Sequence, residues 1–483
     1  MNKGIVRYLL GRMLIVEAGL MILPLIVGLI YRESIKTLGG FLITIAILLL
    51  IGLATGIKTP RNTNLYVKEG LIVAALSWFA LSFFGGLPFV FSGEIPSLVD
   101  AFFETSSGFS TSGLSILTNV EAMSHSMLFW RSFTHLIGGM GVLVFALALL
   151  PSSSPNAVNI MKAEVPGPVF GKLVSKLRDT ARILYIIYLS MTAVLIVLLM
   201  LGGMDLFDAS CHAFGAAGTG GFGIKSTSVA FYDSAYIDYV LGIAMILFGI
   251  NFNLYYFILI GQVKRVFKNE ELRWYLSFIF VAVILLCINL SGLYESVPLM
   301  IRDVFFTVSS IQTTTGYSTA DFGAWPAFSQ AIILLLMVFG ASAGSTGGGL
   351  KVFRVGVLVK SALTEIRKAK EPNQVIRVRF DGAPLEKQAL YSITCYFIVY
   401  VFFITSLVLL ISLDAPDFVT AFSAVISSVN NIGPGLGMVG PTSNYAWLSS
   451  FSKVLLSIGM IAGRLELYPV LILFTPSTWR RRA

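Results

Sequence analysis

Long apolar stretches recur along the whole chain and limit what it can fold into. A helix that crosses a lipid bilayer needs about 20 mostly apolar residues. Nine stretches come close to or exceed this length: Tyr8–Ile30, Gly39–Ile57, Leu71–Phe91, Met127–Leu150, Ile183–Leu201, Tyr239–Ile260, Leu276–Leu293, Leu390–Leu413 and Val454–Phe474. Only 12% of the residues are charged, against about 25% in a soluble domain. The sequence therefore predicts an all-α polytopic membrane protein, and it disfavours a soluble enzyme, a secreted disulfide scaffold and a nucleic-acid binder.

A tenth apolar stretch, Gln330–Leu363, is interrupted by the glycine-rich segment Gly344–Gly349. Ten crossings of the lipid bilayer would place both termini on one side, and lysine and arginine mark the cytoplasmic side. Six basic clusters hold 27 of the 34 lysine and arginine residues and share one side in this arrangement: Lys3–Arg12, Lys58–Lys68, Lys162–Arg182, Lys264–Arg273, Lys351–Lys387 and Arg480–Arg482. We therefore expect both termini in the cytoplasm. The first apolar stretch is long enough to be a retained helix rather than a signal peptide.

A sequence pattern that ends in a glycine turn occurs four times, each time between two apolar stretches. Its copies are DAFFETSSGFSTSGLS (100–115), DASCHAFGAAGTGGFG (208–223), DVFFTVSSIQTTTGYS (303–318) and TAFSAVISSVNNIGPG (420–435). We align them on Gly113, Gly221, Gly316 and Gly433, which we call the anchor glycines. In three copies an aspartate stands thirteen residues before the anchor glycine. Such a fixed spacing indicates one structural unit that is used four times.

Each copy is too short to cross a bilayer and predicts a short helix that enters the membrane, followed by extended backbone that returns. Non-helical backbone at membrane depth is tolerated only where it is buried in protein or lines water. Backbone carbonyls that face an axis can replace the hydration shell of a cation, and glycine permits the dihedral angles that aim them inward. The partly negative C-terminal end of each short helix and the aspartates at its outer end favour a cation as well. The pattern predicts a cation pathway.

With these four turns, the chain resembles the superfamily of K⁺ transporters that includes TrkH, KtrB and the plant HKT proteins. The resemblance covers roughly Leu71 to Phe474, and two additional N-terminal helices are similar to those of TrkH rather than KtrB. It implies four tandem M1–P–M2 pore units with pseudo-fourfold symmetry around one axis. The expected divisions are two N-terminal transmembrane helices (1–69) and pore units at 70–160, 161–273, 274–386 and 387–483, the third with a broken M2 helix.

The resemblance also implies which residues form the selectivity filter, where K⁺ is the one metal expected. These residues are Thr111, Ser112, Gly113, Thr219, Gly220, Gly221, Thr314, Thr315, Gly316, Asn430, Asn431, Ile432 and Gly433. Glycine at all four anchor positions is similar to the K⁺-conducting members, whereas serine at the first would suggest a preference for Na⁺. No copy has the TVGYG sequence of K⁺ channels, so we expect weaker discrimination, with appreciable Rb⁺ and some Na⁺ passage.

The broken M2 segment has the most unusual composition in the chain, and its glycines cannot hold a continuous helix at low cost. By resemblance it is an intramembrane loop that obstructs the pore and moves to open it, formed by Gly344, Ser345, Thr346, Gly347, Gly348 and Gly349. Arg464 is expected within the last M2 helix, where a lone arginine costs at least about 2.5–3.5 kcal/mol. It should therefore face the cavity, and it matches the pore arginine of the family, with a role in gating or as an electrostatic barrier. The alternative is that it pairs with Glu466 or extends to the membrane surface.

We therefore expect K⁺ uptake through a channel-like pore in the bacterial cytoplasmic (inner) membrane. The resemblance further implies a homodimer and a cytosolic TrkA-like regulatory subunit that docks on the basic clusters Lys162–Arg182, Lys264–Arg273 and Lys351–Lys387. No nucleotide site or other cofactor is expected in this chain, so ATP or NADH would be bound by that subunit. A K⁺/H⁺ or K⁺/Na⁺ symporter stays the alternative, although Glu466 is the one carboxylate in the core of the fourth unit.

Two enzyme-like motifs lack the context that catalysis requires. Residues 340–344 fit the GxSxG nucleophile pattern, but all three histidines precede Ser342, whereas a hydrolase of this type needs its histidine later in the chain. The segment GSTGGGLK (344–351) has no lysine directly after its last glycine and no strand before it, unlike a phosphate-binding loop. Cys211, Cys287 and Cys395 are far apart and odd in number, which fits neither a disulfide framework nor a metal site. We expect no enzymatic activity.

Overall fold

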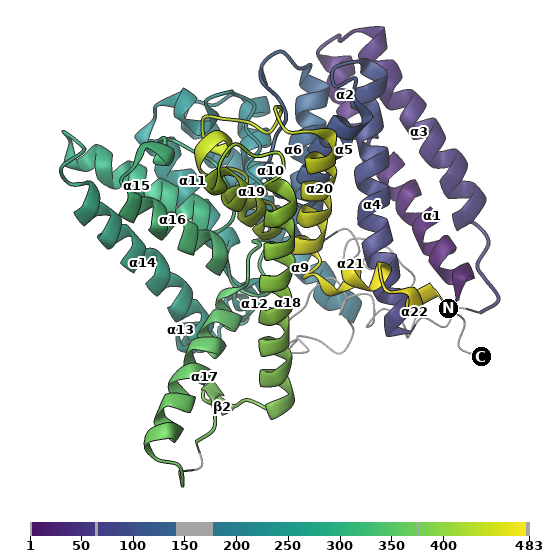
Figure 1. Cartoon of the computed structure of the whole chain (residues 1–483). Coiled ribbons are helices and arrows are strands. Elements are labelled where there is room, and N and C mark those ends of the chain that lie inside the picture. The colour runs from purple at the N-terminus through teal and green to yellow at the C-terminus, as the bar shows by residue number, and fades with distance from the viewer. Residues whose placement is uncertain (1, 63–65, 142–176, 375, 480–483) are drawn as a thin grey trace.

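The structure is a computed structural model that describes residues 2–62, 66–141, 177–374 and 376–479. Within these ranges it consists almost wholly of helices, and its two strands pair as one short antiparallel hairpin (Figure 1). In chain order the elements are α1 Lys3–Leu20, α2 Ile22–Ile30, α3 Ile35–Gly56, α4 Val67–Ser92, α5 Leu98–Phe109, α6 His125–Gly139, α9 Leu177–Leu201, α10 Leu206–Gly218, η1 Ser228–Tyr232, α11 Ala235–Phe248, α12 Phe252–Leu259, α13 Val263–Lys268, α14 Glu270–Leu290, α15 Val297–Gln312, η2 Phe322–Ala324, α16 Ala327–Phe339, α17 Val352–Lys370, β1 Arg379–Phe380, β2 Ala383–Pro384, α18 Lys387–Ile411, α19 Phe418–Asn430, η3 Gly437–Val439, α20 Ser450–Arg464, α21 Tyr468–Leu473 and α22 Pro476–Trp479. The predicted all-α class is confirmed.

Six helices in the described part of the chain are long and apolar enough to cross a membrane. They are Lys3–Ile30 (α1 with α2), α3, α4, Ala181–Leu201 of α9, α14 and α18. Their outer faces carry large apolar side chains, among them Leu50, Phe280 and Phe402, which are 73%, 67% and 69% exposed. A continuous apolar surface of this kind needs lipid or another partner to cover it, and the predicted membrane protein is confirmed.

Four groups of three helices follow α1–α3. Each group has a long first helix, a short second helix that leads into one of the four aligned turns, and a third helix. The groups are α4–α5–α6, α9–α10–α11, α14–α15–α16 and α18–α19–α20. Within each group the short helix packs against both of its neighbours.

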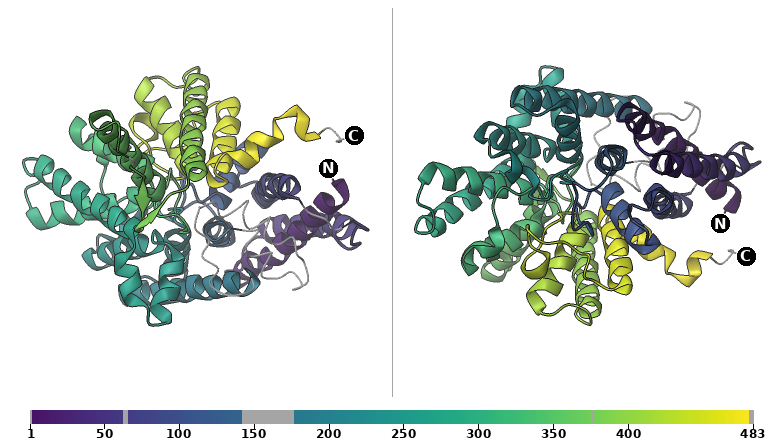
Figure 2. Two further views of the ribbon diagram at one scale, coloured as in Figure 1. Left: turned by 90° about the horizontal axis from the view of Figure 1, so that it is seen from below. Right: turned by 90° about the horizontal axis from the view of Figure 1, so that it is seen from above.

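The third helix of each group also packs against the short helix of the next group. The pairs are α6 with α10, α11 with α15, α16 with α19, and α20 with α5. The last pair closes a circle, and Figure 2 shows the colours running around a common centre from blue through teal and green to yellow. This arrangement brings the turns at the ends of the four short helices toward one centre.

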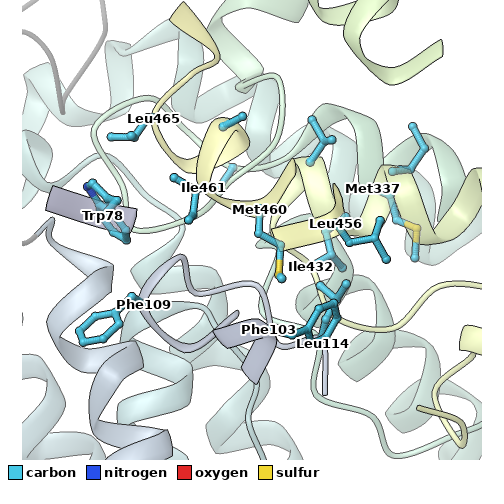
Figure 3. Close-up of a cluster of buried hydrophobic side chains, with 14 of the residues drawn as sticks. Trp78, Phe103, Phe109, Leu114, Met337, Ile432, Leu456, Met460, Ile461 and Leu465 are labelled. Atoms are coloured by element: carbon cyan, nitrogen blue, oxygen red, sulfur yellow. The ribbon is translucent and has the colours of Figure 1, made fainter. Parts of the chain in front are cut away.

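Buried apolar side chains fill the seam between the first and fourth groups (Figure 3). Trp78 of α4, Phe109 of α5 and Ile461 of α20 are each at most 1% exposed. Helices in a bilayer associate chiefly through close van der Waals packing, because lipid tails are as apolar as the side chains. Close packing at this seam therefore holds the circle closed.

Two of the expected single crossings are broken. Tyr239–Ile260 predicts one helix, but α11 and α12 meet at a 92° bend. Val454–Phe474 also predicts one helix, but Glu466 and Leu467 adopt positive φ angles of 55° and 64° between α20 and α21. A left-handed residue cannot continue a right-handed helix, so the helix ends there.

The third group is broken as expected, since α16 ends at Phe339 and α17 begins at Val352. The predicted crossing Met127–Leu150 begins within α6, which ends at Gly139, and its residues from 142 onward lie outside the described residues.

Most of the described basic clusters lie toward one end of the molecule. The start of α1, the short helix α13, and α17 with the β1–β2 hairpin all lie toward the lower end of Figure 1. Residues 162–176 of the third basic cluster and the last cluster, Arg480–Arg482, lie outside the described residues.

Candidate functional site

The four aligned turns have the same backbone geometry. In each, the N–H of the residue before the anchor glycine donates to the carbonyl five residues earlier, as in Ser112 to Ser107 at 2.8 Å and Ile432 to Ser427 at 3.0 Å. This bond is typical of a Schellman motif, in which a left-handed residue ends a helix. The left-handed residues all stand two positions before the anchor glycine: Thr111 (φ 56°), Thr219 (54°), Thr314 (60°) and Asn431 (58°).

Three of these left-handed residues are threonines, which rarely adopt a positive φ because of their branched side chains. A non-glycine residue held in this region costs about 1–3 kcal/mol, and such residues cluster at functional sites. All four are at most 1% exposed. The same costly, buried conformation at four equivalent positions marks the turns as the candidate site.

The anchor glycines place the four turns against one another in a ring. All four have positive φ angles, between 73° and 113°. A Cβ on Gly113 would collide with the carbonyl oxygen of Gly220, one on Gly221 with that of Thr315, and one on Gly316 with that of Ile432. A Cβ on Gly433 would lie 3.3 Å from the carbonyl oxygen of Ser112. Each anchor glycine therefore faces the residue before the anchor glycine of the next repeat, and the fourth faces the first.

All four anchor glycines line one cavity of about 110 Å³. Its wall also includes outer-loop residues such as Pro434, Pro441 and Asn444. Two charged side chains, Arg131 and Lys225, are among the lining residues. The cavity is thus a narrow vestibule between the turns and the loops that follow them, with backbone from all four repeats at its base.

The turns differ in their side-chain support. The Asn431 amide donates to Ser112 Oγ at 2.6 Å, so it links the fourth turn to the first, and Asn430 accepts a bond from the Tyr400 hydroxyl at 2.9 Å. The carbonyl of Gly433 accepts bonds from Tyr445 and Ser427 at 2.9 Å and 2.7 Å. Two side-chain hydroxyl groups therefore fix the position of the Gly433 carbonyl.

In the second turn, Gly220 lies directly against the ring of His135 on α6, where any Cβ would collide. The imidazole is fully buried and stacks on Phe222 with a centroid distance of 4.2 Å. The equivalent positions in the other turns are Ser112, Thr315 and Ile432. His135 thus occupies the space that a side chain at position 220 would need.

The predicted gating loop Gly344–Gly349 lies against the inner side of the turns. The N–H of Gly348 donates to Thr314 Oγ1 at 2.6 Å. A Cβ on Gly347 would lie 2.8 Å from the carbonyl oxygen of Thr313, and one on Gly348 would collide with the carbonyl of Asn430. Only residues without a side chain fit this closely beneath the ring.

Arg464 is the last residue of α20 and not, as expected, in the middle of a helix. Its guanidinium donates to the carbonyl of Thr346 in the loop at 2.6 Å, and to the carbonyls of Gly138, at 2.6 Å, and Gly139 at the end of α6. Carbonyls at a helix C-terminus lack partners within the helix and carry partial negative charge. The alternative pairing with Glu466 is not found, because Glu466 forms an ion pair with Arg354 of α17.

The three aspartates that stand thirteen residues before an anchor glycine each have a partner outside the vestibule. Asp100 and Asp208 lie in the first turns of α5 and α10 as expected, whereas Asp303 lies in the middle of α15. Asp100 forms an ion pair with Lys453 at 2.7 Å. Asp208 accepts a hydrogen bond from Tyr232 at 2.6 Å, and Asp303 accepts one from Tyr294 at 3.1 Å. These bonds show that the three aspartates connect neighbouring elements, whereas their expected effect on the cation concentration at the mouth stays a prediction.

A buried ion pair supports the first and second turns, and no sequence pattern pointed to it. Arg131 Nε lies 2.6 Å from Glu104 Oε1, with side-chain exposures of 3% and 0%. Arg131 also donates to the carbonyl of Gly223 at 2.8 Å, and Glu104 accepts from the N–H of Ile116 at 2.9 Å. The pair therefore joins the returning backbone of two adjacent repeats.

Comparisons with known proteins cover nearly the whole chain. The model of the TrkH family, described as a cation transport protein, matches residues 39–481. The Trk system potassium uptake protein TrkH of Escherichia coli K12 is 34% identical over 480 residues, which are 98% of each chain. The protein of the same name from Halomonas elongata is 30% identical over 491 residues, covering 100% of each chain.

A solved structure agrees with these sequence matches. The crystal structure of the potassium transporter TrkH from Vibrio parahaemolyticus superimposes with a TM-score of 0.89, at 29% identity, over 99% of this chain and 100% of that one. The matches confirm the resemblance and the expectation that the chain is a transport protein and not an enzyme. The chain therefore belongs to the TrkH family of cation transport proteins.

Proposed function

We propose that this chain takes up K⁺ across the bacterial cytoplasmic membrane through a channel-like pore at the ring of four turns. The observation that carries the proposal is that all four anchor glycines line one cavity and that each faces a backbone carbonyl of the next repeat. Full-length relatives carry the name potassium uptake protein. In this proposal the pore units are residues 70–160, 161–273, 274–386 and 387–483, and residues 1–69 add two outer helices.

The selectivity filter in this proposal is the backbone of the thirteen filter residues named in the sequence analysis, which lie in the four turns that end at Gly113, Gly221, Gly316 and Gly433. Closely spaced carbonyls can replace the water around a dehydrated K⁺ ion. The fixed Schellman geometry supports this role, because a filter must hold its carbonyls in place when no ion is bound. The bonds that Tyr445 and Ser427 make to the Gly433 carbonyl leave fewer carbonyl lone pairs for the ion, which supports weaker discrimination than in a K⁺ channel.

The loop Gly344–Gly349 is the proposed gate, and Arg464 is the residue that holds it shut. Thr346 and Gly348 are bonded to Arg464 and to Thr314 directly beneath the turns, so an ion that leaves the filter would meet the loop. A fixed guanidinium next to the pathway also repels cations. Opening requires the loop to leave these partners.

We further propose a homodimer and a cytosolic TrkA-like subunit that binds ATP or NADH and moves the loop. α17 continues directly from the loop and carries several of the basic residues of Lys351–Lys387. It projects away from the helix bundle in Figure 1. A partner bound to α17 could therefore pull on the gate without contacting the membrane core.

Channel-like transport is favoured over a K⁺/H⁺ or K⁺/Na⁺ symporter. Glu466, the carboxylate nearest to Arg464 in sequence, is engaged in an ion pair with Arg354. Breaking a buried ion pair to free one partner is costly, so this carboxylate is poorly suited to carry a proton in each transport cycle.

The test is the zero-current potential of the purified protein in liposomes under a tenfold K⁺ gradient, at two Na⁺ concentrations and two pH values. A K⁺ pore gives a potential near that of the K⁺ gradient, about 59 mV for a monovalent ion, and this potential does not change with pH. A potential that follows pH or Na⁺ at fixed K⁺ would instead support a symporter.

A variant without residues 344–349 should pass more K⁺, and unchanged flux would contradict the proposal that this loop is the gate.

A further inference from the structure

Glu271, in the first turn of α14, binds both ends of the loop Gly344–Gly349. Its Oε1 accepts a hydrogen bond from the N–H of Ala343 at 2.7 Å and another from the N–H of Phe353 at 3.2 Å. Ala343 directly precedes the loop, and Phe353 is the second residue of α17, three positions after Leu350. Glu271 itself is 5% exposed. One carboxylate oxygen thus fixes the separation of the two ends.

The N-terminus of α17 needs this outside acceptor. The first N–H groups of a helix have no partner within the helix, and the residue before α17, Lys351, provides no side-chain cap. A carboxylate near a helix N-terminus also interacts favourably with the helix dipole. At most helix starts a local aspartate or serine accepts a hydrogen bond from these N–H groups. At the start of α17 the acceptor is Glu271, which comes from another helix.

The turn that carries Glu271 is itself fixed to α17 and to the β1–β2 hairpin. The neighbouring Glu270 forms an ion pair with Lys360 of α17, and its Oε2 accepts from the N–H of Asp381 in the β1–β2 turn at 3.0 Å. Asp381 in return accepts from the N–H of Glu270 at 2.6 Å. The bonds of Glu270 to Lys360 and Asp381 therefore fix the position of Glu271, and Glu271 in turn fixes the positions of Ala343 and Phe353.

We propose that Glu271 is a positioning residue of the gate, which keeps the loop closed by holding its two ends together. Arg464 and Lys351 bind carbonyls in the middle of the loop, whereas Glu271 binds N–H groups at its ends. The inference rests on the proposed function, because it assumes that the loop obstructs the pathway. It adds that the loop opens by separation of Ala343 and Phe353 from one carboxylate.

The test compares K⁺ flux through Glu271→Ala and Glu271→Gln, each with the loop intact and with residues 344–349 deleted. With the loop intact, Glu271→Ala should raise flux about tenfold, the order expected when hydrogen bonds to a carboxylate are lost. Glu271→Gln keeps one amide oxygen as an acceptor and should raise flux less, by about twofold to fivefold. With the loop deleted, neither substitution should change flux further.

Glu365→Gln is the matched control, because Glu365 is an exposed glutamate of α17 paired only with Lys368 in the ion pairs of the described residues. If the deletion alone leaves flux unchanged, the proposed gate fails whatever Glu271 does. If the deletion raises flux but Glu271→Gln equals the control, the gate stands and the role of Glu271 is overturned. If the Glu271 substitutions raised K⁺ flux equally in the intact and the loop-deleted chain, the role of Glu271 in the gate would also be overturned. Should Glu271→Ala not fold, the isosteric Glu271→Gln alone decides between these outcomes.

Discussion

At the scale of single residues, the sequence predicts where the chain turns but not how the turn is built. The four anchor glycines align by spacing, and all four adopt the positive φ angles that glycine permits. The left-handed Thr111, Thr219 and Thr314 could not be predicted, because intrinsic preference disfavours this conformation for threonine. Tertiary contacts impose it, and the only signal in the sequence is the repeated position two residues before the glycine.

Contacts between side chains that are far apart in the chain could also not be predicted from the sequence. Glu104 and Arg131 stand 27 residues apart, and Glu271 lies more than 70 residues from the loop ends that it binds. A charged residue within an apolar stretch signals that it has a partner, but it does not identify that partner. Arg464 illustrates this limit: its pore-facing position was expected, whereas its partners Gly138 and Gly139 come from another repeat.

Substitution of an anchor glycine tests the ring directly. In Gly316→Ala, the new methyl group would collide with the carbonyl of Ile432, and alanine would have to adopt a φ of 88°. Strain of about 1–3 kcal/mol would displace that carbonyl, so we expect K⁺ flux to fall about tenfold or more and the K⁺/Na⁺ permeability ratio to decrease. Both are measured from zero-current potentials and tracer flux in liposomes.

Gly292→Ala is the control for that experiment. Gly292 follows α14, and nothing lies within 4 Å of a Cβ built there. This variant should retain the flux and the permeability ratio of the original chain. If Gly316→Ala behaved in the same way, the close approach of Gly316 to Ile432 would have no role in permeation.

At the scale of helices, apolar length predicted the first helix of every group but not the breaks in the third helices. α14 and α18 coincide well with the stretches Leu276–Leu293 and Leu390–Leu413. The breaks in Tyr239–Ile260 and Val454–Phe474 were missed because a hydropathy window records composition and not direction. Glycine-rich composition revealed the break in the third group, where Gly347–Gly349 stand together, whereas the glycines of Tyr239–Ile260 and Val454–Phe474 stand apart and gave no such signal.

The short helix α19 offers a prediction about helix capping and pH. Asp417 caps this helix by accepting hydrogen bonds from the N–H and hydroxyl of Thr420 at 2.8 Å and 2.7 Å. These bonds to Thr420 lower the pKa of the Asp417 carboxyl below its usual value. A lowered pKa means that the ionised cap stabilises the fold above the ordinary pKa of aspartate, and that this contribution is lost as the pH falls through the lowered value.

We therefore expect Asp417→Ala to lower the stability at neutral pH by about 1 kcal/mol, the usual value of an N-cap. Asp417→Asn keeps an acceptor but loses the charge, so its stability at neutral pH should lie between those of Asp417→Ala and the original chain. Thermal unfolding of the detergent-solubilised protein at several pH values measures both. The deficit of Asp417→Ala should shrink in acid, and a deficit that stays constant down to strongly acidic pH would show that the charge of the cap has no part in it.

At the scale of the whole molecule, the sequence predicted four repeated units, and the structure adds how helices of successive groups meet. Repetition alone is compatible with a row as well as with a ring. The contact of α20 with α5, filled by Trp78, Phe109 and Ile461, is what closes the circle. Such a closing contact joins the two ends of the repeat series, and no local sequence pattern encodes it.

We predict the orientation of the molecule in the membrane from its charge, and two introduced cysteines can test this prediction. The loop between α19 and α20, which contains the vestibule residue Pro441, and the basic helix α17 lie at opposite ends of the helix bundle (Figure 1). Because lysine and arginine are retained in the cytoplasm, α17 should lie inside the cell and the vestibule outside. Thr442 and Ala369 are exposed positions on the two sides.

In a chain whose three native cysteines are replaced by alanine, a membrane-impermeant maleimide should label Thr442→Cys in intact cells. It should label Ala369→Cys only after the cells are permeabilised. Detergent-solubilised protein provides the control, because both cysteines should then react. Labelling of Ala369→Cys in intact cells, with Thr442→Cys protected, would reverse the orientation. The carbonyl ring would then face the cytoplasm, and a pore that admits K⁺ from outside through the vestibule would no longer be tenable.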